Sequence, residues 1–195
     1  MLGCYKLRRK GNGVIYMVDH VYTDPATEPA WHDWYAGYLR KLTSVPGIDT
    51  AQRFRALDCA PPRYLAMYSV ASVGVYESDA YRNMGGGGSQ SAQFHHAYQL
   101  WTRNLFEGAD RAPVVRDGQR VLVIDRGERG GNGAIESRAT WVSAVGLHMT
   151  TKFRGFIVLD KDEETPPLPG SFVYTPFTPP LSASISERTD SRSSS

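Results

Sequence analysis

The sequence predicts an α+β fold, in which an antiparallel sheet carries helices on one of its faces. The main observation is an amphipathic helix over residues 31–45, whose large apolar residues recur at intervals of three and four. Runs of β-branched and aromatic residues at 13–22, 50–57 and 63–70 predict three strands around it. With a second helix and a short strand after them, the order is β-α-β-β-α-β, which is the ferredoxin-like arrangement.

Turn-forming residues set the limits of these first elements. Either Asp24-Pro25 or Thr27-Glu28-Pro29 can begin the helix, and Pro46-Gly47 ends it. The stretch 58–62 contains two prolines and makes the turn between the next two strands. Alternation along the first strand places four side chains on one face: Tyr16, Val18, His20 and Tyr22.

The rest of the first unit is predicted with a helix near its end. A short helix is expected at 73–81, followed by the glycines at 85–88, which are either mobile or wrap closely around a neighbour. Residues 91–106 show helical periodicity, with Phe94, Tyr98, Trp101 and Leu105 spaced 4-3-4, and 112–115 could form a short strand. We therefore place the first unit at residues 13–117.

The second half, residues 118–178, is predicted to be rich in β-structure and to belong to the same domain. Strands are expected at 120–125, 153–159 and 171–174, while 140–145 could be strand or helix. Four glycines between Gly127 and Gly133 indicate a loop. Serine and threonine dominate residues 182–195, so a disordered tail is expected there.

Composition narrows the functional class. The chain has 195 residues and a formal net charge of +2, so no basic surface for nucleic acid is indicated. Cys4 and Cys59 are too few for a disulfide framework or a cysteine-based zinc site. Because there is neither an apolar run of about 20 residues nor a signal-peptide pattern, we expect a cytoplasmic protein without a membrane partner.

Residues 14–106 resemble the dimeric α+β barrel proteins, in particular their EthD-like branch. The resemblance rests on these stretches: Trp31-His32-Asp33-Trp34-Tyr35 with Leu39 and Leu42, Val45-Pro46-Gly47-Ile48, Ala51-Gln52-Arg53-Phe54, Pro62-Arg63-Tyr64-Leu65-Ala66-Met67-Tyr68 and Ala80-Tyr81-Arg82. Members often carry a Glu-His pair in the first helix. Gly37 and Tyr38 occupy those positions here, so Tyr38 has replaced the histidine or the chemistry lies elsewhere.

The resemblance implies a barrel closed by a second sheet and a pocket between sheet and helices in each unit. The second sheet comes from another subunit, as in a homodimer, or from residues 118–178 as a degenerate second copy that lost its first helix. Such pockets serve cofactor-free isomerases, cyclases and lyases, and also haem-degrading monooxygenases. The fold alone does not choose among these reactions.

Several residues are candidates for proton transfer and for stabilising negative charge. His20 lies near the end of its predicted strand and could act as a general base, or it could be an ordinary core histidine. His148 could cover the pocket from the second half. Tyr16, Tyr38 and Tyr68 could donate hydrogen bonds to a developing oxyanion, or they could be core tyrosines.

Further candidates concern substrate binding and haem. Adjacent helical residues point about 100° apart, so only one of His95 and His96 could face the pocket, and His96 is our substrate-binding candidate. His95, His96 or His20 could ligate haem. Trp101 is expected to contact the substrate, whereas His32 is expected to be solvated.

Two arginines lie on one face of a predicted strand. Arg55 could bind an anionic substrate group, whereas for Arg53 we favour an edge position paired with Asp49 or Asp58.

The motifs that are absent point away from common cofactors. The sequence contains no P-loop, no phosphate-binding Gly-x-Gly-x-x-Gly after a strand, no Gly-x-Ser-x-Gly and no His-Glu-x-x-His. We therefore expect an enzyme without a cofactor, a lyase or an isomerase (cyclase included), acting by proton transfer on a small hydrophobic, aromatic, oxygenated molecule. The alternatives are a haem-binding monooxygenase and a non-catalytic binding or assembly protein.

Overall fold

The structure, a computed structural model, describes residues 13–58, 61, 63–86, 88–131, 133–165 and 167–183. Its first half contains β1 (Val14–Tyr22), α1 (Glu28–Thr43), β2 (Ile48–Ala56), β3 (Tyr64–Val70), the 3-10 helix η1 (Val73–Glu77), α2 (Asp79–Asn83), the 3-10 helix η2 (Ser89–Ala97) and β4 (Tyr98–Glu107). Its second half contains β5 (Gln119–Arg126), the 3-10 helix η3 (Glu136–Arg138), β6 (Thr140–Leu147), β7 (Phe153–Asp160), β8 (Ser171–Pro176) and β9 (Leu181–Ser182).

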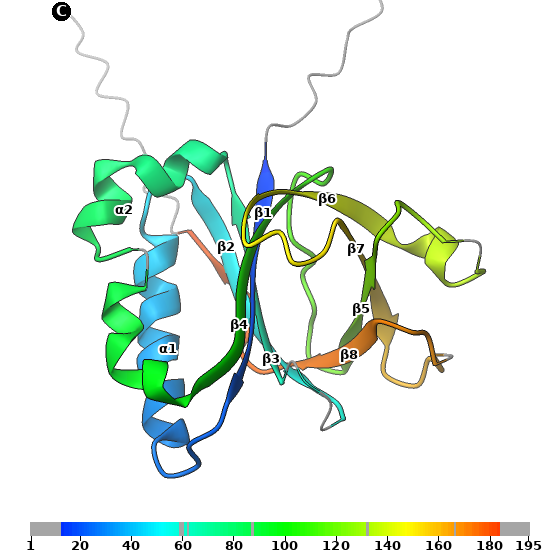
Figure 1. Ribbon diagram of the computed structural model, residues 1–195, viewed down its shortest axis with the longest axis horizontal. Helices are drawn as coiled ribbons and strands as arrows, with labels where there is room; N and C mark the ends of the chain where they lie inside the picture. Colours follow the sequence, from blue (N-terminus) through cyan, green and yellow to red (C-terminus); the bar gives the residue numbers. More distant parts are fainter. Residues whose placement is uncertain are drawn as a thin grey trace, which may run out of the picture.

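Eight of these strands close into an antiparallel barrel within the single chain. The strand order is β3-β1-β4-β6-β7-β5-β8-β2, and β2 pairs again with β3 to complete the circle, while β9 adds to β2. Helices α1 and α2 lie together on one side of the barrel (Figure 1). The expected α+β barrel is confirmed, and the second half of the chain completes it.

The two halves of the barrel repeat the same strand order. The first half runs β2-β3-β1-β4 and the second half runs β6-β7-β5-β8. Asp19 on β1 pairs with Leu65 on β3, and Asp125 on β5 pairs with Arg154 on β7, so the two aspartates hold corresponding positions. Between β1 and β2 the chain forms α1, whereas the described residues between β5 and β6 form only the short η3. The outer face of the first half therefore carries the helical layer (Figure 1).

Two predicted elements differ in the structure. Residues 91–106 are not a helix, because the chain leaves η2 at Ala97 and continues as β4, which pairs with both β1 and β6. Strand pairing overrides the helical spacing of the aromatics here, as tertiary context often does. Residues 112–115 are not a strand. The backbone N–H of Ala112 donates to the Ser69 hydroxyl, and that of Val115 donates to the side-chain oxygen of Gln52.

Residues 73–81, 140–145 and the C-terminal stretch were also predicted from the sequence. The predicted helix at 73–81 is divided into η1 and α2, with the Ser78 hydroxyl accepting from the N–H of Tyr81 at the start of α2. Residues 140–147 are a strand. The first two residues of the predicted tail lie in or directly after β9, and residues 184–195 lie outside the described residues. None of the helices in the described segments is long and apolar enough to span a membrane.

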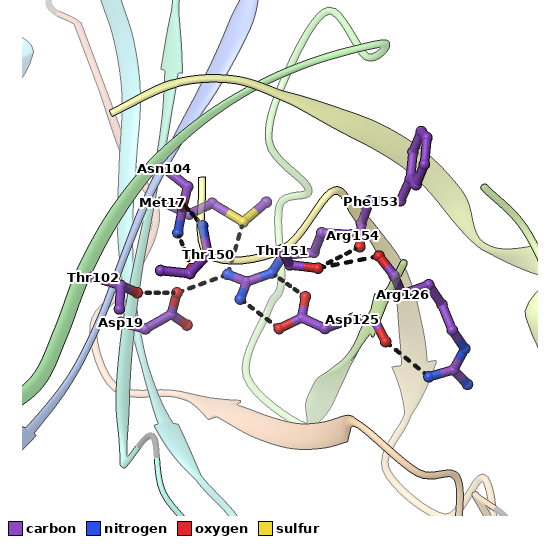
Figure 2. Close-up of polar contacts among 10 residues, drawn as sticks. All are labelled: Met17, Asp19, Thr102, Asn104, Asp125, Arg126, Thr150, Thr151, Phe153 and Arg154. Carbon is purple, nitrogen blue, oxygen red and sulfur yellow. Dashed lines mark hydrogen bonds and ion pairs between the residues drawn. The ribbon is translucent and has the colours of Figure 1, made fainter. Parts of the chain in front are cut away.

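The barrel interior contains a buried ion network that joins the two halves (Figure 2). Arg154 donates to Asp19 at 2.8 Å and to both carboxylate oxygens of Asp125 at 2.7 and 2.9 Å. Asp19 and Arg154 are each 3% exposed. Burial raises the pKa of Asp19, and the charge of Arg154 opposes that rise. This network connects β1 of the first half to β5 and β7 of the second.

Candidate functional site

A cavity of about 50 Å³ lies between the outer face of the first half-barrel and its helical layer. The sheet contributes side chains from β1, β3 and β4, and the cover comes from α1, α2 and η2. Six tyrosines, two tryptophans, one histidine and one arginine line it, and no aspartate or glutamate does. The cavity is therefore aromatic, rich in hydroxyl groups, and without a negative charge of its own.

Strand and helix periodicity explains how the sequence builds this cavity. On β1 the alternate residues Tyr16, Val18 and His20 face outward toward the helices, as predicted, while their neighbours enter the barrel core. On α1 the spacing of three and four directs Trp34, Tyr38 and Leu42 toward the same space.

His20 is the most unusual group in the cavity wall. It is 1% exposed, and neither ring nitrogen has a hydrogen-bond partner among the residues that the structure describes. Its ring lies edge-on to Trp31 with centroids 5.0 Å apart, and parallel to Tyr35 at 6.1 Å. Burial, and then the positive charge of Arg53, lower the pKa of His20 to about 3. The imidazole is therefore neutral at physiological pH, and no hydrogen bond from the described residues occupies either nitrogen.

Tyrosines share the cavity wall with His20. The Tyr35 and Tyr68 hydroxyls lie 3.2 Å apart, and the Tyr16 ring stacks on Tyr68 with centroids 5.3 Å apart. Burial raises the pKa values of Tyr16, Tyr38 and Tyr68 above the ordinary value of a phenol. These hydroxyls consequently stay protonated and can act as hydrogen-bond donors.

Arg103 on β4 supplies the positive charge that lines the cavity. Its guanidinium carbon lies 4.8 Å from the centre of the Trp101 ring, and its Nε is buried without a partner. Arg103 was not predicted as a site residue, because residues 91–106 were expected to form a helix. The alternation of Trp101, Arg103 and Leu105 was the signal available, since these three face outward while Phe106 enters the barrel.

Five of the eight predicted site residues meet at this cavity: His20, Tyr38, Tyr16, Tyr68 and Trp101. Gly88 also lines it, and a Cβ atom there would lie 3.4 Å from Trp101. Gly86 packs directly against the Tyr81 ring, where a Cβ atom would clash at 2.3 Å. The described part of the glycine-rich stretch thus fits closely around aromatic rings.

Three predicted site residues lie elsewhere. His148 follows the exposed end of β6, where its Nδ1 accepts from the backbone N–H of Arg103 at 3.3 Å. His96 is exposed on η2, with Nε2 at 3.4 Å from Asp24. Arg55 is exposed on β2. None of the three lines the cavity, and these assignments are corrected.

The expectations for Arg53 and His32 are also corrected. Arg53 is 1% exposed, lies beneath α1 and makes no ion pair within the described segments, so it is not an edge arginine paired with Asp49 or Asp58. His32 is only partly exposed, and its Nδ1 lies 3.2 Å from Nη2 of Arg53.

The residues present do not fit a haem. A cavity of about 50 Å³ is far smaller than a porphyrin. His95 is engaged with the Ser91 hydroxyl at 2.7 Å, and His20 lies at the wall of this small space. Within the described segments, no three His, Cys, Asp or Glu side chains are grouped to hold a metal ion.

Comparison with solved structures identifies the fold. The chain is similar to an anthrone oxidase-like protein, with a TM-score of 0.59 over 89% of this chain and 94% of that chain, at 9% identity. It also aligns with a chlorite dismutase-like protein over 77% and 80% of the two chains, but that TM-score of 0.44 at 8% identity carries no argument. No family model matches the sequence. No curated protein matches it either. The likeness therefore shows an α+β barrel fold, and nothing about activity.

Proposed function

We propose that this cavity catalyses cofactor-independent proton transfer on an aromatic, oxygenated carbon acid, as a lyase or isomerase does. One observation carries the proposal: His20 is buried, neutral and unpartnered at the wall of a cavity whose other polar groups are hydrogen-bond donors. A neutral imidazole can accept a proton, and the donors can stabilise the anion that results.

In this mechanism a C–H bond that a carbonyl acidifies, either directly or through an aryl ring, breaks, and the proton moves to a nitrogen of His20. The electron pair moves to the carbonyl oxygen, giving an enolate. Return of the proton to another atom completes an isomerisation, and loss of a leaving group completes an elimination. Neither route needs an oxidant or a cofactor.

Tyrosine hydroxyls and Arg103 stabilise the enolate. Tyr16, Tyr38 and Tyr68 stay protonated at neutral pH, so they can donate to the developing oxyanion. The pKa of about 3 describes His20 without a ligand. A negative charge formed beside the imidazole raises that pKa and makes the proton transfer more favourable.

The size of the cavity limits how a substrate binds. Cavities of about 150 Å³ hold a benzene ring, so about 50 Å³ admits the reacting carbonyl and not a whole ring. The aromatic part of the substrate then lies against the partly exposed Trp34 and Trp101, which line the same cavity. Stacking on indole rings suits an aromatic ligand.

Anthrone is a suitable probe because the structural neighbour is described as anthrone oxidase-like. Its CH₂ group lies between two aryl rings and is acidified by the ketone, which makes it a carbon acid. We would measure deuterium uptake at this CH₂ group by NMR, in D₂O under nitrogen, with wild-type and with heat-denatured protein. Exchange that is faster only with folded protein is expected. Equal rates with folded and with heat-denatured protein would contradict the proposal.

A second candidate function is supported by the same small volume. If the aromatic side chains of the protein fill the pocket, the chain is a non-catalytic binding or assembly protein. This alternative predicts neither exchange nor a ligand-dependent change in melting temperature. Measuring both the exchange rate and the melting temperature with and without anthrone therefore separates the two candidates.

We also infer the finer points of architecture. The strand order β2-β3-β1-β4 with α1 supports a ferredoxin-like unit at residues 13–117, and the repeated order in 118–178 supports a degenerate second copy. The EthD-like branch, the homodimer and a cytoplasmic location remain proposals from the sequence. Because the barrel closes within one chain, the homodimer is not needed for closure.

A further inference from the structure

The guanidinium group of Arg53 is buried beneath α1 among aromatic rings. Its central carbon lies 4.0 Å from the ring centre of Tyr35, 4.5 Å from that of Trp31 and 5.3 Å from that of Phe177. Burial lowers the pKa of Arg53, which reports the penalty for placing this charge away from water. Arginine is rarely buried to 1% exposure unless it is paired.

Arg53 has no acidic partner in direct contact. Its Nη2 donates to Nδ1 of His32, whereas its Nη1 is buried with no partner. Glu28 does not contact Arg53 itself. Its carboxylate lies 3.8 Å from Nε2 of His32 and accepts a hydrogen bond from the Tyr64 hydroxyl. In the part of the chain that the structure describes, no carboxylate oxygen lies within 4 Å of the guanidinium. A buried cation with an unused donor is what a site built for an anion contains before the anion binds.

The sheet places Arg53 close to His20. Arg53 on β2 pairs with Ala66 on β3, and Ala66 pairs with Val18 on β1. Because alanine is small, the long arginine side chain can cross β3 toward β1. Three rings contact both Arg53 and His20, namely those of Trp31, Tyr35 and Tyr64.

Tyr35 also connects Arg53 to the cavity. Its ring lies against the guanidinium and is part of the cavity wall, so the positive charge is located directly behind that wall. His20 lines the cavity with two unpartnered nitrogens, of which a neutral imidazole protonates one. The cavity thus has an N–H donor at its surface and an unpaired cation behind it.

We propose that His20 and Arg53 form an anion-binding site at this cavity. It takes a single anionic group: the carboxylate, phenolate or enolate oxygen of an aromatic ligand, or a small inorganic anion. His20 donates its N–H to the anion. Arg53 provides the positive charge, because no carboxylate of the described residues lies within 4 Å of its guanidinium to neutralise it. This site deepens the proposed function by naming the charge of the ligand, but it does not require turnover, so binding and catalysis can fail separately.

The test measures binding to the full-length protein by calorimetry in a chloride-free buffer at pH 7. Benzoate and benzyl alcohol serve as an anionic and a neutral aromatic probe, and nitrate serves as an inorganic anion. Arg53→Met removes the charge. Arg55→Met is the matched control, because Arg55 lies two residues away on the same strand and is exposed.

We expect benzoate to bind wild-type protein at least about tenfold more tightly than benzyl alcohol. Arg53→Met should weaken that preference, because of the described residues only Arg103 then remains as a cation at the cavity, while Arg55→Met should keep it. Nitrate that displaces benzoate identifies a site that also takes free anions, whereas benzoate binding without nitrate binding assigns the site to the anionic group of an aromatic ligand. If the wild-type protein binds neither anion more tightly than benzyl alcohol, the proposal is overturned.

The proposal can be tested even if Arg53→Met does not fold. The comparison of benzoate with benzyl alcohol on wild-type protein needs no variant. His20→Gln offers a second variant, and it should weaken benzoate binding by about tenfold or more while its melting transition stays cooperative. Unchanged benzoate binding in a folded His20→Gln protein would overturn the proposal as well.

Discussion

Replacing Arg154 by methionine tests how the two halves of the barrel are held together. Arg154 contacts Asp19 from the first half and Asp125 from the second, in the interior of the barrel (Figure 2). The substitution keeps most of the volume of the side chain and removes its charge. It leaves Asp19, which is 3% exposed, without a cation beside it.

The expected effect is large for a single substitution. Removing one partner of a buried ion pair costs about 3–5 kcal/mol, because the remaining charge is left uncompensated. For a chain of this size, about 2–4 °C of melting temperature corresponds to each kcal/mol, which gives a decrease of roughly 6–20 °C. Urea denaturation at pH 7, followed by circular dichroism, measures the free energy of unfolding directly.

The matched control is Arg138→Met. Arg138 also pairs with a carboxylate, that of Glu163, but its side chain is 51% exposed, so little change is expected. The double variant Asp19→Asn with Arg154→Met should recover part of the lost stability, since it removes the stranded charge. If Arg154→Met destabilises the protein no more than Arg138→Met does, the network does not hold the halves together.

The other predictions concern the cavity and the charge of Asp19. Because the pKa of His20 is about 3, kcat/KM for proton exchange should stay level from pH 8 to pH 5. With a histidine of ordinary pKa, kcat/KM would fall about thirtyfold over this range. A decline centred near pH 6.5 would contradict this prediction. Arg103→Met should weaken the binding of anionic aromatic ligands, measured by calorimetry, and leave neutral ones unaffected, and an equal loss for both would exclude a role for its charge. Folding raises the pKa of Asp19 above its unfolded-state value of 3.8. The protonated carboxyl group therefore stabilises the folded protein fully below pH 3.8, and this contribution is lost as the pH rises through the folded-state pKa. Asp19→Asn should therefore gain stability relative to wild type as the pH rises above about 4, and denaturation curves with a constant difference across that range would refute the shift.

Local patterns predicted most of the first half of the fold. The alternation on β1 placed Tyr16 and His20 on the helical side of the sheet, and the spacing on α1 placed Tyr38 beside them. These assignments succeed because side-chain direction in a strand or helix depends on periods of two and 3.6 residues, which a sequence displays.

The assignments that failed depend on pairings between distant segments. β4 is a strand because it lies between β1 and β6, and no local pattern reports those neighbours. The error hid Arg103. Arg53 was misplaced for a similar reason, since its burial depends on α1 lying over β2 and on the small Ala66 beside it. Charged residues whose partners are aromatic rings have no signature in a sequence.

The proton-transfer account is tested most directly by comparing two histidine variants in the anthrone exchange assay. His20 lines the cavity, whereas His96 is exposed outside it, so His20→Gln and His96→Gln make the same chemical change at different places. We predict that His20→Gln lowers the rate of exchange by about 10²–10⁴ with its melting transition still cooperative, and that His96→Gln leaves the rate unchanged. Equal rates in the two folded variants would contradict the assignment of His20 as the proton acceptor.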